Sequence, residues 1–292
     1  MLFRQRVLLE LIRCAAPVKP LRLFKLAFLL ARTSLLDRNE IYDFVPYRYG
    51  PYSFTLKHEL DKFQEDGLVL SFADGFKSVS SSPMDCSIDA RLAVARLQRQ
   101  YSAVETDDLV KSVYKTFPWF TINASAAGSR GMERPKAAPS VYTIGYEGLT
   151  VEAFLDKLIQ AGVTRLVDVR SNPVARRFGF HGSTLKRLSH KLGIEYVHLP
   201  HLGVASSVRK QLGAGMDYPR FFSLYRTSME SAEGDLELAC TLATGGDAAF
   251  MCKEAVPEQC HRSELAKLIA KRVGLPIIEL TQCLTISKPH ES

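Results

Sequence analysis

Residues 248–262 read Ala-Ala-Phe-Met-Cys-Lys-Glu-Ala-Val-Pro-Glu-Gln-Cys-His-Arg. The first five form an uninterrupted apolar run, which is typical of a strand buried on both faces of a parallel sheet. From residue 261 to residue 272 the apolar side chains recur at the spacing of an amphipathic helix. A buried strand followed by such a helix is the repeating unit of an α/β fold.

The same alternation of strand and helix extends over residues 141–280. The expected strands are 141–145, 165–169, 196–199, 248–252 and 276–280, and the expected helices are 150–161, 182–192, 218–230, 232–244 and 261–272. This pattern predicts a three-layer α/β/α sandwich with a mostly parallel sheet. Right-handed crossovers then place the carboxyl ends of the strands at one edge, where ligands bind in open α/β sheets.

The first part of the chain has a different pattern. Helical spacing predicts helices over 3–14, 20–36 and 53–66, followed by a β-hairpin over 68–80 and by helices over 87–99 and 105–116. Three helices followed by a hairpin predict a mainly α winged helix-turn-helix domain. Residues 123–140 are small, contain Gly and Pro and lack apolar periodicity, as linkers do. We therefore expect a winged-helix domain at 1–122, a linker at 123–140 and an α/β domain at 141–292.

The stretch Phe-Val-Pro-Tyr-Arg-Tyr-Gly-Pro-Tyr-Ser at 44–53 precedes the third expected helix. It resembles the winged-helix domains of antitoxin-like and prophage-associated proteins, in which a Tyr-Gly-Pro-Tyr or Tyr-Gly-Pro-Phe turn occupies this place. The alternative is that Tyr47, Tyr49 and Tyr52 only pack around a Gly-Pro turn. Winged helices bind proteins as well as DNA, so the resemblance alone assigns no partner.

Bulk composition narrows the class of protein. The 38 basic and 31 acidic residues give a net charge of +7 and a pI near 9.1, which permits a nucleic-acid partner without requiring one. Six cysteines, at 14, 86, 240, 252, 260 and 283, are scattered without a secretory signal, so we expect no disulfide framework and a cytoplasmic location. No apolar run reaches the roughly 20 residues of a membrane span, so no membrane partner is expected.

Polar, ionisable side chains follow nearly every strand of the expected sheet. Since these strand ends share one edge, we expect one site there. Among the expected catalytic residues, Glu147 or Glu254 is the general acid or base, and Cys260 or His261 assists. The expected substrate-binding residues are Tyr146, Asp168, Arg170, Ser171, Asn172, His198, Cys252 and Arg262.

An anion is the ligand that this pattern favours. Cys260 and His261 stand at the start of helix 261–272, where backbone N–H groups and the helix dipole attract negative charge. Arg170 and Arg262 can add bidentate contacts to a phosphate or carboxylate. The alternative is that these arginines are held by Asp168 or Glu254 as ion pairs that fix the loops.

The cysteines allow two further interpretations. Beside His261, Arg262 and a helix N-terminus, Cys260 would have a lowered pKa and act as a nucleophile; alternatively it packs at the start of the helix. Cys252, Cys260, His261 and His198 are all metal-ligand types. However, the spacing Cys-x7-Cys-His matches no compact zinc motif, and we therefore predict no metal site.

Five ordered motifs point to one family. They are Thr-Ile-Gly-Tyr-Glu-Gly at 143–148, Asp-Val-Arg-Ser-Asn-Pro at 168–173, Gly-Ile-Glu-Tyr-Val-His-Leu-Pro at 193–200, Leu-Gly at 202–203, and Cys-Lys-Glu-Ala-Val-Pro-Glu-Gln-Cys-His-Arg at 252–262. Together they resemble the bacterial domain-of-unknown-function family four hundred and eighty-eight, which has a Cys-His-Arg signature. The resemblance implies that the polar strand edge is a family feature, but it assigns no reaction.

Two details qualify this resemblance. The family's double Gly after the His-Leu-Pro strand is Gly203-Val204 here, which changes the shape expected for that loop. The Asp-Val-Arg strand end also resembles rhodanese domains, although the loop between Cys252 and Cys260 carries Glu254, Pro257 and Glu258 in place of a compact anion cradle. Members with a winged-helix-like N-terminal extension resemble this chain over its full length, which suggests nucleic-acid-associated work.

These observations predict a nucleic-acid-associated enzyme, of hydrolase or glycosylase type, that acts on a phosphate-bearing group or a base in a strand-edge pocket. One alternative is a non-catalytic DNA-binding regulator that senses a nucleotide-like ligand. Another is a thiol-based sulfur or redox protein. The N-terminal domain would dock DNA, RNA or a protein partner, and the residues indicate neither a cofactor nor an oligomeric state.

Overall fold

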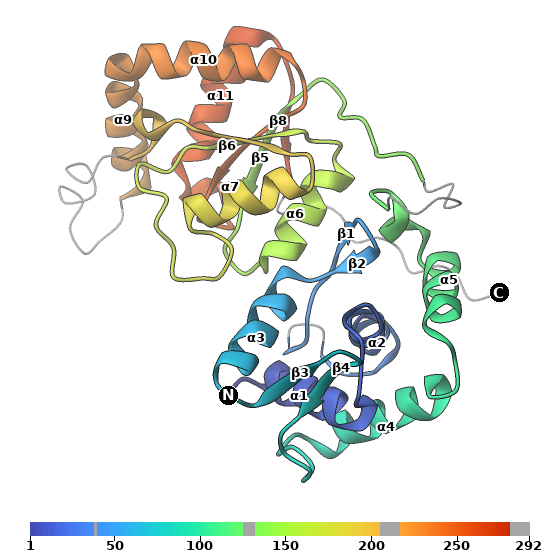
Figure 1. Ribbon diagram of the computed structural model, residues 1–292. Helices are drawn as coiled ribbons and strands as arrows, with labels where there is room; N and C mark the ends of the chain where they lie inside the picture. The colour runs from blue at the N-terminus through green and yellow to red at the C-terminus, as the bar shows by residue number, and fades with distance from the viewer. Residues whose placement is uncertain (38–39, 125–131, 205–216, 281–292) are drawn as a thin grey trace. The chain divides into compact units, whose positions relative to one another are not determined.

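The structure, a computed structural model, describes residues 1–37, 40–124, 132–204 and 217–280 (Figure 1). The chain forms two compact units, Met1–Glu133 and Arg134–Ser292. Residues 134–140, expected in the linker, pack on the second unit, where Arg134 donates to the carbonyl oxygens of Leu192 at 2.7 Å and Val163 at 3.1 Å. The sequence of an extended segment that is hydrogen-bonded to a domain lacks apolar periodicity, as the sequence of a free linker does. The sequence therefore did not reveal that Arg134 attaches this segment to the second unit. Residues 125–131 of the expected linker lie outside the described residues.

The first unit is mainly helical, as predicted. The predicted hairpin follows three helices (Figure 1), and the winged helix-turn-helix assignment of this unit stays a prediction. The elements are α1 (Phe3–Ala15), α2 (Pro20–Thr33), β1 (Val45–Tyr47), β2 (Gly50–Tyr52), α3 (Phe54–Glu65), β3 (Val69–Phe72), β4 (Gly75–Ser78), α4 (Ile88–Tyr101), α5 (Thr106–Thr116) and a 3-10 turn at Pro118–Thr121.

One element of this unit was not predicted. Strands β1 and β2 form a second antiparallel hairpin, with Pro46 opposite Pro51 and a turn that ends at Gly50 with a φ of 85°. Tyr52 of this hairpin stacks on Phe24 at 4.7 Å between ring centroids, and Tyr47 lies 5.0 Å from Tyr52. The stretch 44–53 therefore packs as an aromatic cluster, which agrees with the packing alternative for two of its three tyrosines.

The second unit is the predicted three-layer α/β sandwich. Its five-stranded sheet has the order β7-β6-β8-β5-β9, and every pair is parallel. The elements are β5 (Val141–Gly145), α6 (Val151–Gln160), β6 (Arg165–Asp168), α7 (Gly182–Lys191), β7 (Glu195–His198), a 3-10 turn (Pro200–Leu202), α9 (Tyr218–Met229), a 3-10 turn (Glu230–Ala232), α10 (Glu233–Thr244), β8 (Ala248–Cys252), a 3-10 turn (Pro257–Gln259), α11 (His261–Val273) and β9 (Ile277–Glu279).

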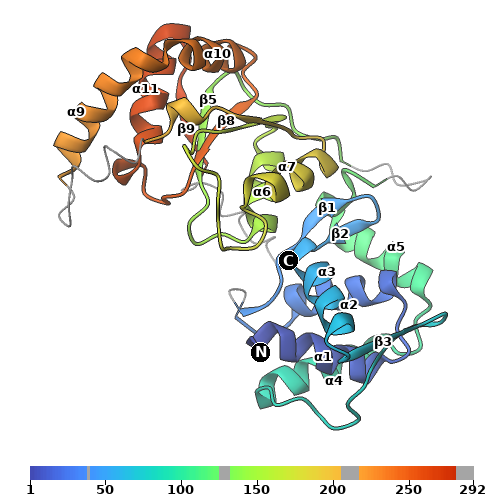
Figure 2. The same ribbon diagram turned by 60° about the vertical axis from the view of Figure 1, so that its left-hand side comes forward.

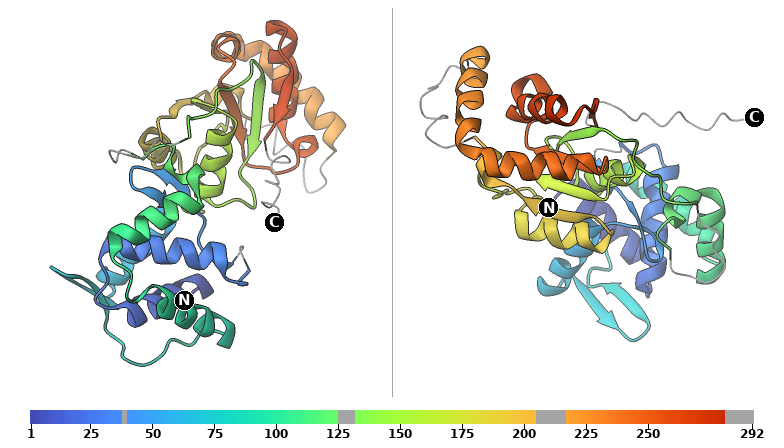
Figure 3. Two further views of the ribbon diagram at one scale, coloured as in Figure 1. Left: turned by 90° about the vertical axis from the view of Figure 1, so that its right-hand side faces the viewer. Right: turned by 90° about the horizontal axis from the view of Figure 1, so that it is seen from above.

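Helices cover both faces of this sheet. Helices α9, α10 and α11 pack on one face and α6 and α7 on the other, as Figures 2 and 3 show. On the first face, Phe250 and Cys252 of β8 belong to one apolar core with Tyr225 of α9 and Leu265 of α11. Strand β8 is thus buried between two helical layers, as its unbroken apolar run predicted.

The register of the sheet places the predicted site residues along one edge. Gly145, the last residue of β5, pairs with Cys252, the last residue of β8. Asp168, the last residue of β6, pairs with Met251 of β8 on one side and with His198 of β7 on the other. Four neighbouring strands therefore end together, with β8 in the middle of the sheet.

Two predictions about the whole chain can be compared with the described part. The five cysteines that the structure describes are free, and Cys283 lies outside it. Among the described helices, none combines the length and apolarity that crossing a bilayer requires.

Candidate functional site

Two thiols and one carboxylate meet at the carboxyl end of β8. Cys252 ends that strand, Glu254 lies in the loop after it, and Cys260 immediately precedes α11. The Glu254 Oε2 atom accepts hydrogen bonds from Cys252 Sγ at 3.3 Å and from Cys260 Sγ at 3.1 Å. Both cysteines are buried, whereas Glu254 is half-buried. Residues eight apart in the sequence thus converge on one oxygen atom.

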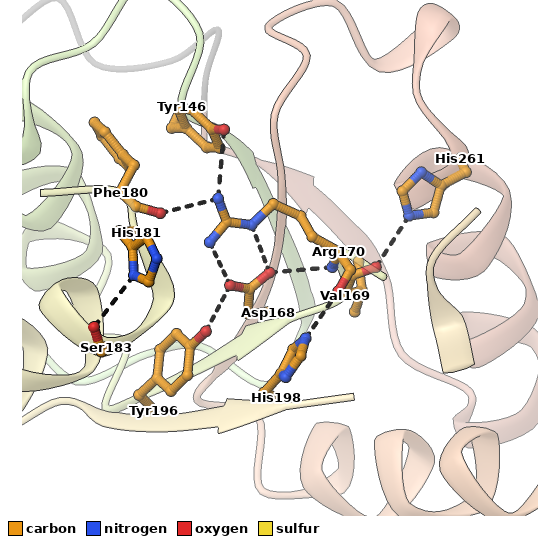
Figure 4. A network of polar contacts seen from close by, with 10 residues as sticks. All are labelled: Tyr146, Asp168, Val169, Arg170, Phe180, His181, Ser183, Tyr196, His198 and His261. Carbon is orange, nitrogen blue, oxygen red and sulfur yellow. Dashed lines mark hydrogen bonds and ion pairs between the residues drawn. The ribbon is translucent and has the colours of Figure 1, made fainter. Parts of the chain in front are cut away.

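His261, the first residue of α11, adds an imidazole. We call Cys252, Glu254, Cys260 and His261 together the thiol cluster. The His261 Nε2 atom lies 3.3 Å from the carbonyl oxygen of Val169, as Figure 4 shows. Since a carbonyl oxygen only accepts hydrogen bonds, Nε2 carries a proton, and in the neutral ring Nδ1 then presents a lone pair. That Nδ1 atom lies 3.7 Å from Cys252 Sγ. The ligand atoms of Cys252, Cys260 and His261 all lie within 4.8 Å of one another.

The titration of Cys260 differs from the prediction. Burial raises the pKa of its thiol well above the ordinary value, and the neighbouring Cys252 raises it further, while His261 lowers it only in part. The expected lowering by His261, Arg262 and the helix N-terminus was wrong because removal from water disfavours the thiolate more strongly. For Glu254, burial acts to raise the pKa, but hydrogen bonds from Cys260 and Cys252 outweigh it and lower the pKa overall.

Arg262 holds the loop that carries Glu254. The buried guanidinium donates through Nη1 to the Glu254 carbonyl oxygen and through Nη2 to the Ala255 carbonyl oxygen at 3.2 Å. Nη2 also lies 3.2 Å from Glu279 Oε2 on β9, and Thr143 donates to that same carboxylate oxygen. The hydrogen bonds of Arg262 therefore go to protein oxygens, and contact with an external anion stays a prediction.

Asp168 and Arg170 form a second, separate network. Arg170 donates to Asp168 through Nε at 2.8 Å and Nη2 at 2.5 Å, and both side chains are buried. Tyr196 donates to the same carboxylate at 2.6 Å. Arg170 Nη1 donates to the Phe180 carbonyl oxygen at 3.0 Å and approaches the Tyr146 hydroxyl at 3.4 Å (Figure 4). This geometry corresponds to the alternative in which an ion pair fixes the loops.

The remaining predicted residues lie around these two networks. Glu147 is exposed, and its Oε2 accepts from the Ala255 N–H at 3.2 Å. Ser171 donates to the Val204 carbonyl oxygen at 3.0 Å, and Asn172 is exposed. His198 contacts the Arg170 carbonyl oxygen through Nε2 at 2.8 Å, so it belongs to the Asp168 side of the edge and not to the thiol cluster.

Three contributors to the site were missed at the sequence level. Glu279 stood inside an apolar strand, where a carboxylate is a signal of a buried partner. Tyr196 began an expected strand and looked like ordinary β-sheet packing. The Val169 carbonyl group that orients His261 belongs to the backbone, so the type of residue at position 169 does not indicate this contact.

A comparison with protein families matches the part of the chain that contains this site. No curated protein and no solved structure matches the chain significantly. Residues 150–269 match the family described as Domain of unknown function DUF488, and this range contains all four residues of the thiol cluster. The match identifies residues 150–269 of the α/β unit as a DUF488 domain.

Proposed function

We propose that this chain is a nucleic-acid-associated enzyme whose α/β unit acts on a phosphate-bearing group or a base at the carboxyl edge of its sheet. The observation that carries the proposal is the contact between the loops after β5 and β8, each of which bears a carboxylate. Glu147, after β5, accepts the N–H of Ala255, the residue that follows Glu254. One carboxylate is exposed and the other half-buried. Carboxylates on two contacting loops, in unlike surroundings, support general acid and base roles.

Glu147 is the better placed of the two to reach a substrate. Its side chain is exposed, while its backbone N–H donates to the Lys253 carbonyl oxygen at 2.8 Å, so the residue is fixed to the end of β8. Glu254, in contrast, is engaged by two thiols. We therefore assign proton transfer at the substrate to Glu147.

Exposed cations near the same edge support an anionic substrate. Arg176 and Arg177 lie in the loop after β6, and Lys253 directly follows β8. Arg177 reaches the Gly148 carbonyl oxygen at 3.4 Å, next to Glu147 in the sequence. Unlike the buried Arg170 and Arg262, these side chains are open to solvent and can bind phosphate groups.

The test uses the full chain with fluorescently labelled single-stranded and duplex oligonucleotides. Base release and strand cleavage are followed by chromatography and gel electrophoresis. We expect turnover that falls about 100-fold or more in Glu147→Gln, since general acid–base groups contribute at that scale. Glu258→Gln, at an exposed carboxylate of the neighbouring loop after β8, is the matched control and should retain the wild-type rate.

Binding gives an independent readout. Neutralising both exposed arginines, Arg176→Gln with Arg177→Gln, should weaken oligonucleotide affinity and reduce its dependence on salt concentration. Salt-dependent binding without any turnover would contradict an enzyme and favour the DNA-binding regulator. An absence of binding at low salt would remove the nucleic-acid part of the proposal.

A further inference from the structure

The ligand atoms of Cys252, Cys260 and His261 lie within 4.8 Å of one another at the end of β8, and the Glu254 carboxylate contacts two of these three residues. Cys252 Sγ is 3.7 Å from His261 Nδ1 and 3.3 Å from Glu254 Oε2, and Cys260 Sγ is 3.1 Å from that same oxygen. A tetrahedral zinc ion, with Zn–S of about 2.3 Å and Zn–N and Zn–O of about 2.0 Å, separates its sulfur ligands from nitrogen or oxygen ligands by about 3.5 Å. The observed separations bracket that value.

The chemistry of these donors selects the metal. Two thiolates and an imidazole are soft to borderline ligands, which suit zinc and do not suit magnesium or calcium. We propose that Cys252, Cys260 and His261 bind one zinc ion and that the Glu254 carboxylate supplies the fourth ligand. Each thiol releases its proton to solvent as its Zn–S bond forms, so both cysteines bind as thiolates.

The surroundings orient these ligands as metal sites require. The Val169 carbonyl oxygen accepts the Nε2 proton of His261, which leaves the Nδ1 lone pair facing Cys252. Arg262, held by Glu279, fixes the backbone carbonyl of Glu254 and thereby the position of its carboxylate. Such outer contacts set ring orientation and ligand position in metalloproteins.

A divalent cation fits the charge of this cluster. Two thiolates and the Glu254 carboxylate carry three negative charges, and a zinc ion compensates two of them. The completely buried Arg262 already has a counter-charge in Glu279 and lies beside the loop of Glu254. Zinc therefore offsets most of the negative charge that the two thiolates would bring into a buried site.

Topology explains why the ligand spacing looks unlike a zinc motif. Compact motifs place paired ligands two to four residues apart on one turn. Here Cys252 ends a strand, whereas Cys260 and His261 begin the helix that returns along the sheet. The pairing is created by the strand–loop–helix geometry and not by a short local turn.

The experiment measures metal in the purified full chain after zinc loading and exhaustive dialysis without chelator. We expect about one zinc per chain by mass spectrometry of the elements. Cys252→Ala, Cys260→Ala and His261→Ala should each reduce the zinc content at least tenfold. Cys240→Ser is the matched control, because this half-buried cysteine of α10 lies outside the cluster, and it should keep one zinc.

A second measurement needs no substitution, which matters because a buried variant can fail to fold. Cobalt exchanged into the wild-type chain should give the intense visible bands of a tetrahedral ion and a thiolate-to-cobalt charge-transfer band in the near ultraviolet. Glu254→Ala should keep that charge-transfer band while the visible bands shift, because water replaces the carboxylate.

Three outcomes would overturn the inference: less than about a tenth of a zinc per chain after loading, a cobalt spectrum without the thiolate band, or a Cys252–Cys260 disulfide in the protein as purified. The inference does not depend on the proposed reaction. Zinc without oligonucleotide turnover would sustain the metal site and contradict the enzyme, whereas turnover in a zinc-free chain would do the opposite.

Discussion

The Arg262 guanidinium donates through Nη1 to the backbone carbonyl oxygen of Glu254, and this contact ties the start of α11 to the loop after β8. Glu279 of β9 contacts the same guanidinium through Nη2 at 3.2 Å. The position of Glu254 therefore depends on a side chain that never touches the Glu254 carboxylate. Arg262 is a positioning residue for the thiol cluster.

Replacing Arg262 should destabilise the second unit. Arg262→Met leaves two carbonyl oxygens and the Glu279 carboxylate without their buried donor, and removal of one partner from a buried pair costs about 3–5 kcal/mol. Urea unfolding followed by far-ultraviolet circular dichroism measures the loss. Glu279→Gln, which keeps a polar side chain beside the guanidinium, should cost less. A loss below about 1 kcal/mol for Arg262→Met would show that the contact is not structural.

The backbone of Gly145 packs closely against the Glu254 loop, and this contact gives a second prediction. A Cβ atom at this position would overlap the Glu254 carbonyl oxygen and stand 3.1 Å from Arg262 Nη1. Gly145→Ala should therefore push the loop away and lower the free energy of unfolding by about 1–3 kcal/mol, as overpacking does. Gly234→Ala in α10 is the control, since a Cβ there meets nothing within 4 Å, and it should be neutral or slightly stabilising. Equal stability of both variants in thermal unfolding would refute the argument.

The Asp168–Arg170 pair should show strong energetic coupling. Asp168→Asn leaves the buried Arg170 without a counter-charge, and we expect a cost of about 3–5 kcal/mol. The double change Asp168→Leu with Arg170→Met should cost less than the sum of the two single changes, because no buried charge remains. Tyr196→Phe removes one hydrogen bond and should cost only about 1–3 kcal/mol. If the loss of unfolding free energy in the double variant equalled the sum of the losses in the two single variants, measured by urea unfolding, the buried ion pair would be contradicted.

The first unit should become more stable as pH rises from 7 to 10. Burial lowers the pKa of Lys25 in α2 to about 7, whereas an unfolded lysine titrates near about 10.4. Between these values the unfolded chain binds one proton more than the folded chain, so stability increases with pH by up to about 1.4 kcal/mol per unit. Below pH 7 both states are protonated, and the burial cost is present in full and constant.

Trp119, the only tryptophan of the chain, lies in the first unit and reports its unfolding by fluorescence. Lys25→Met should be more stable than the wild type at pH 7 and should lose the rise between pH 7 and 10. Lys57→Met, at an exposed lysine paired with Asp61, should keep that rise. The same slope in all three proteins would show that Lys25 does not cause it.

Periodicity in the sequence predicts most of the architecture. Strands 141–145 and 248–252 have the predicted bounds, because a strand buried on both faces must be apolar throughout. The hairpin at Val45–Tyr52 escaped prediction because its two strands are three residues long and each contains a proline, which argues against a strand. It forms because Tyr52 packs against Phe24 of α2, a contact between distant parts of the chain.

Residue types at strand ends were enough to predict where polar groups gather, since parallel strands share one carboxyl edge. The partner that each group binds there depends on tertiary structure. Residue types left open whether Arg170 and Arg262 hold an external anion or fix the loops. The structure pairs Arg170 with Asp168, and it pairs Arg262 with backbone carbonyl groups and Glu279. Burial, which depends on packing over the whole unit, raises the pKa of Cys260 where local charges alone suggested the opposite. The thiol cluster likewise exists because the sheet register and the start of α11 bring Cys252, Cys260 and His261 together, and no short-range spacing encodes such a contact.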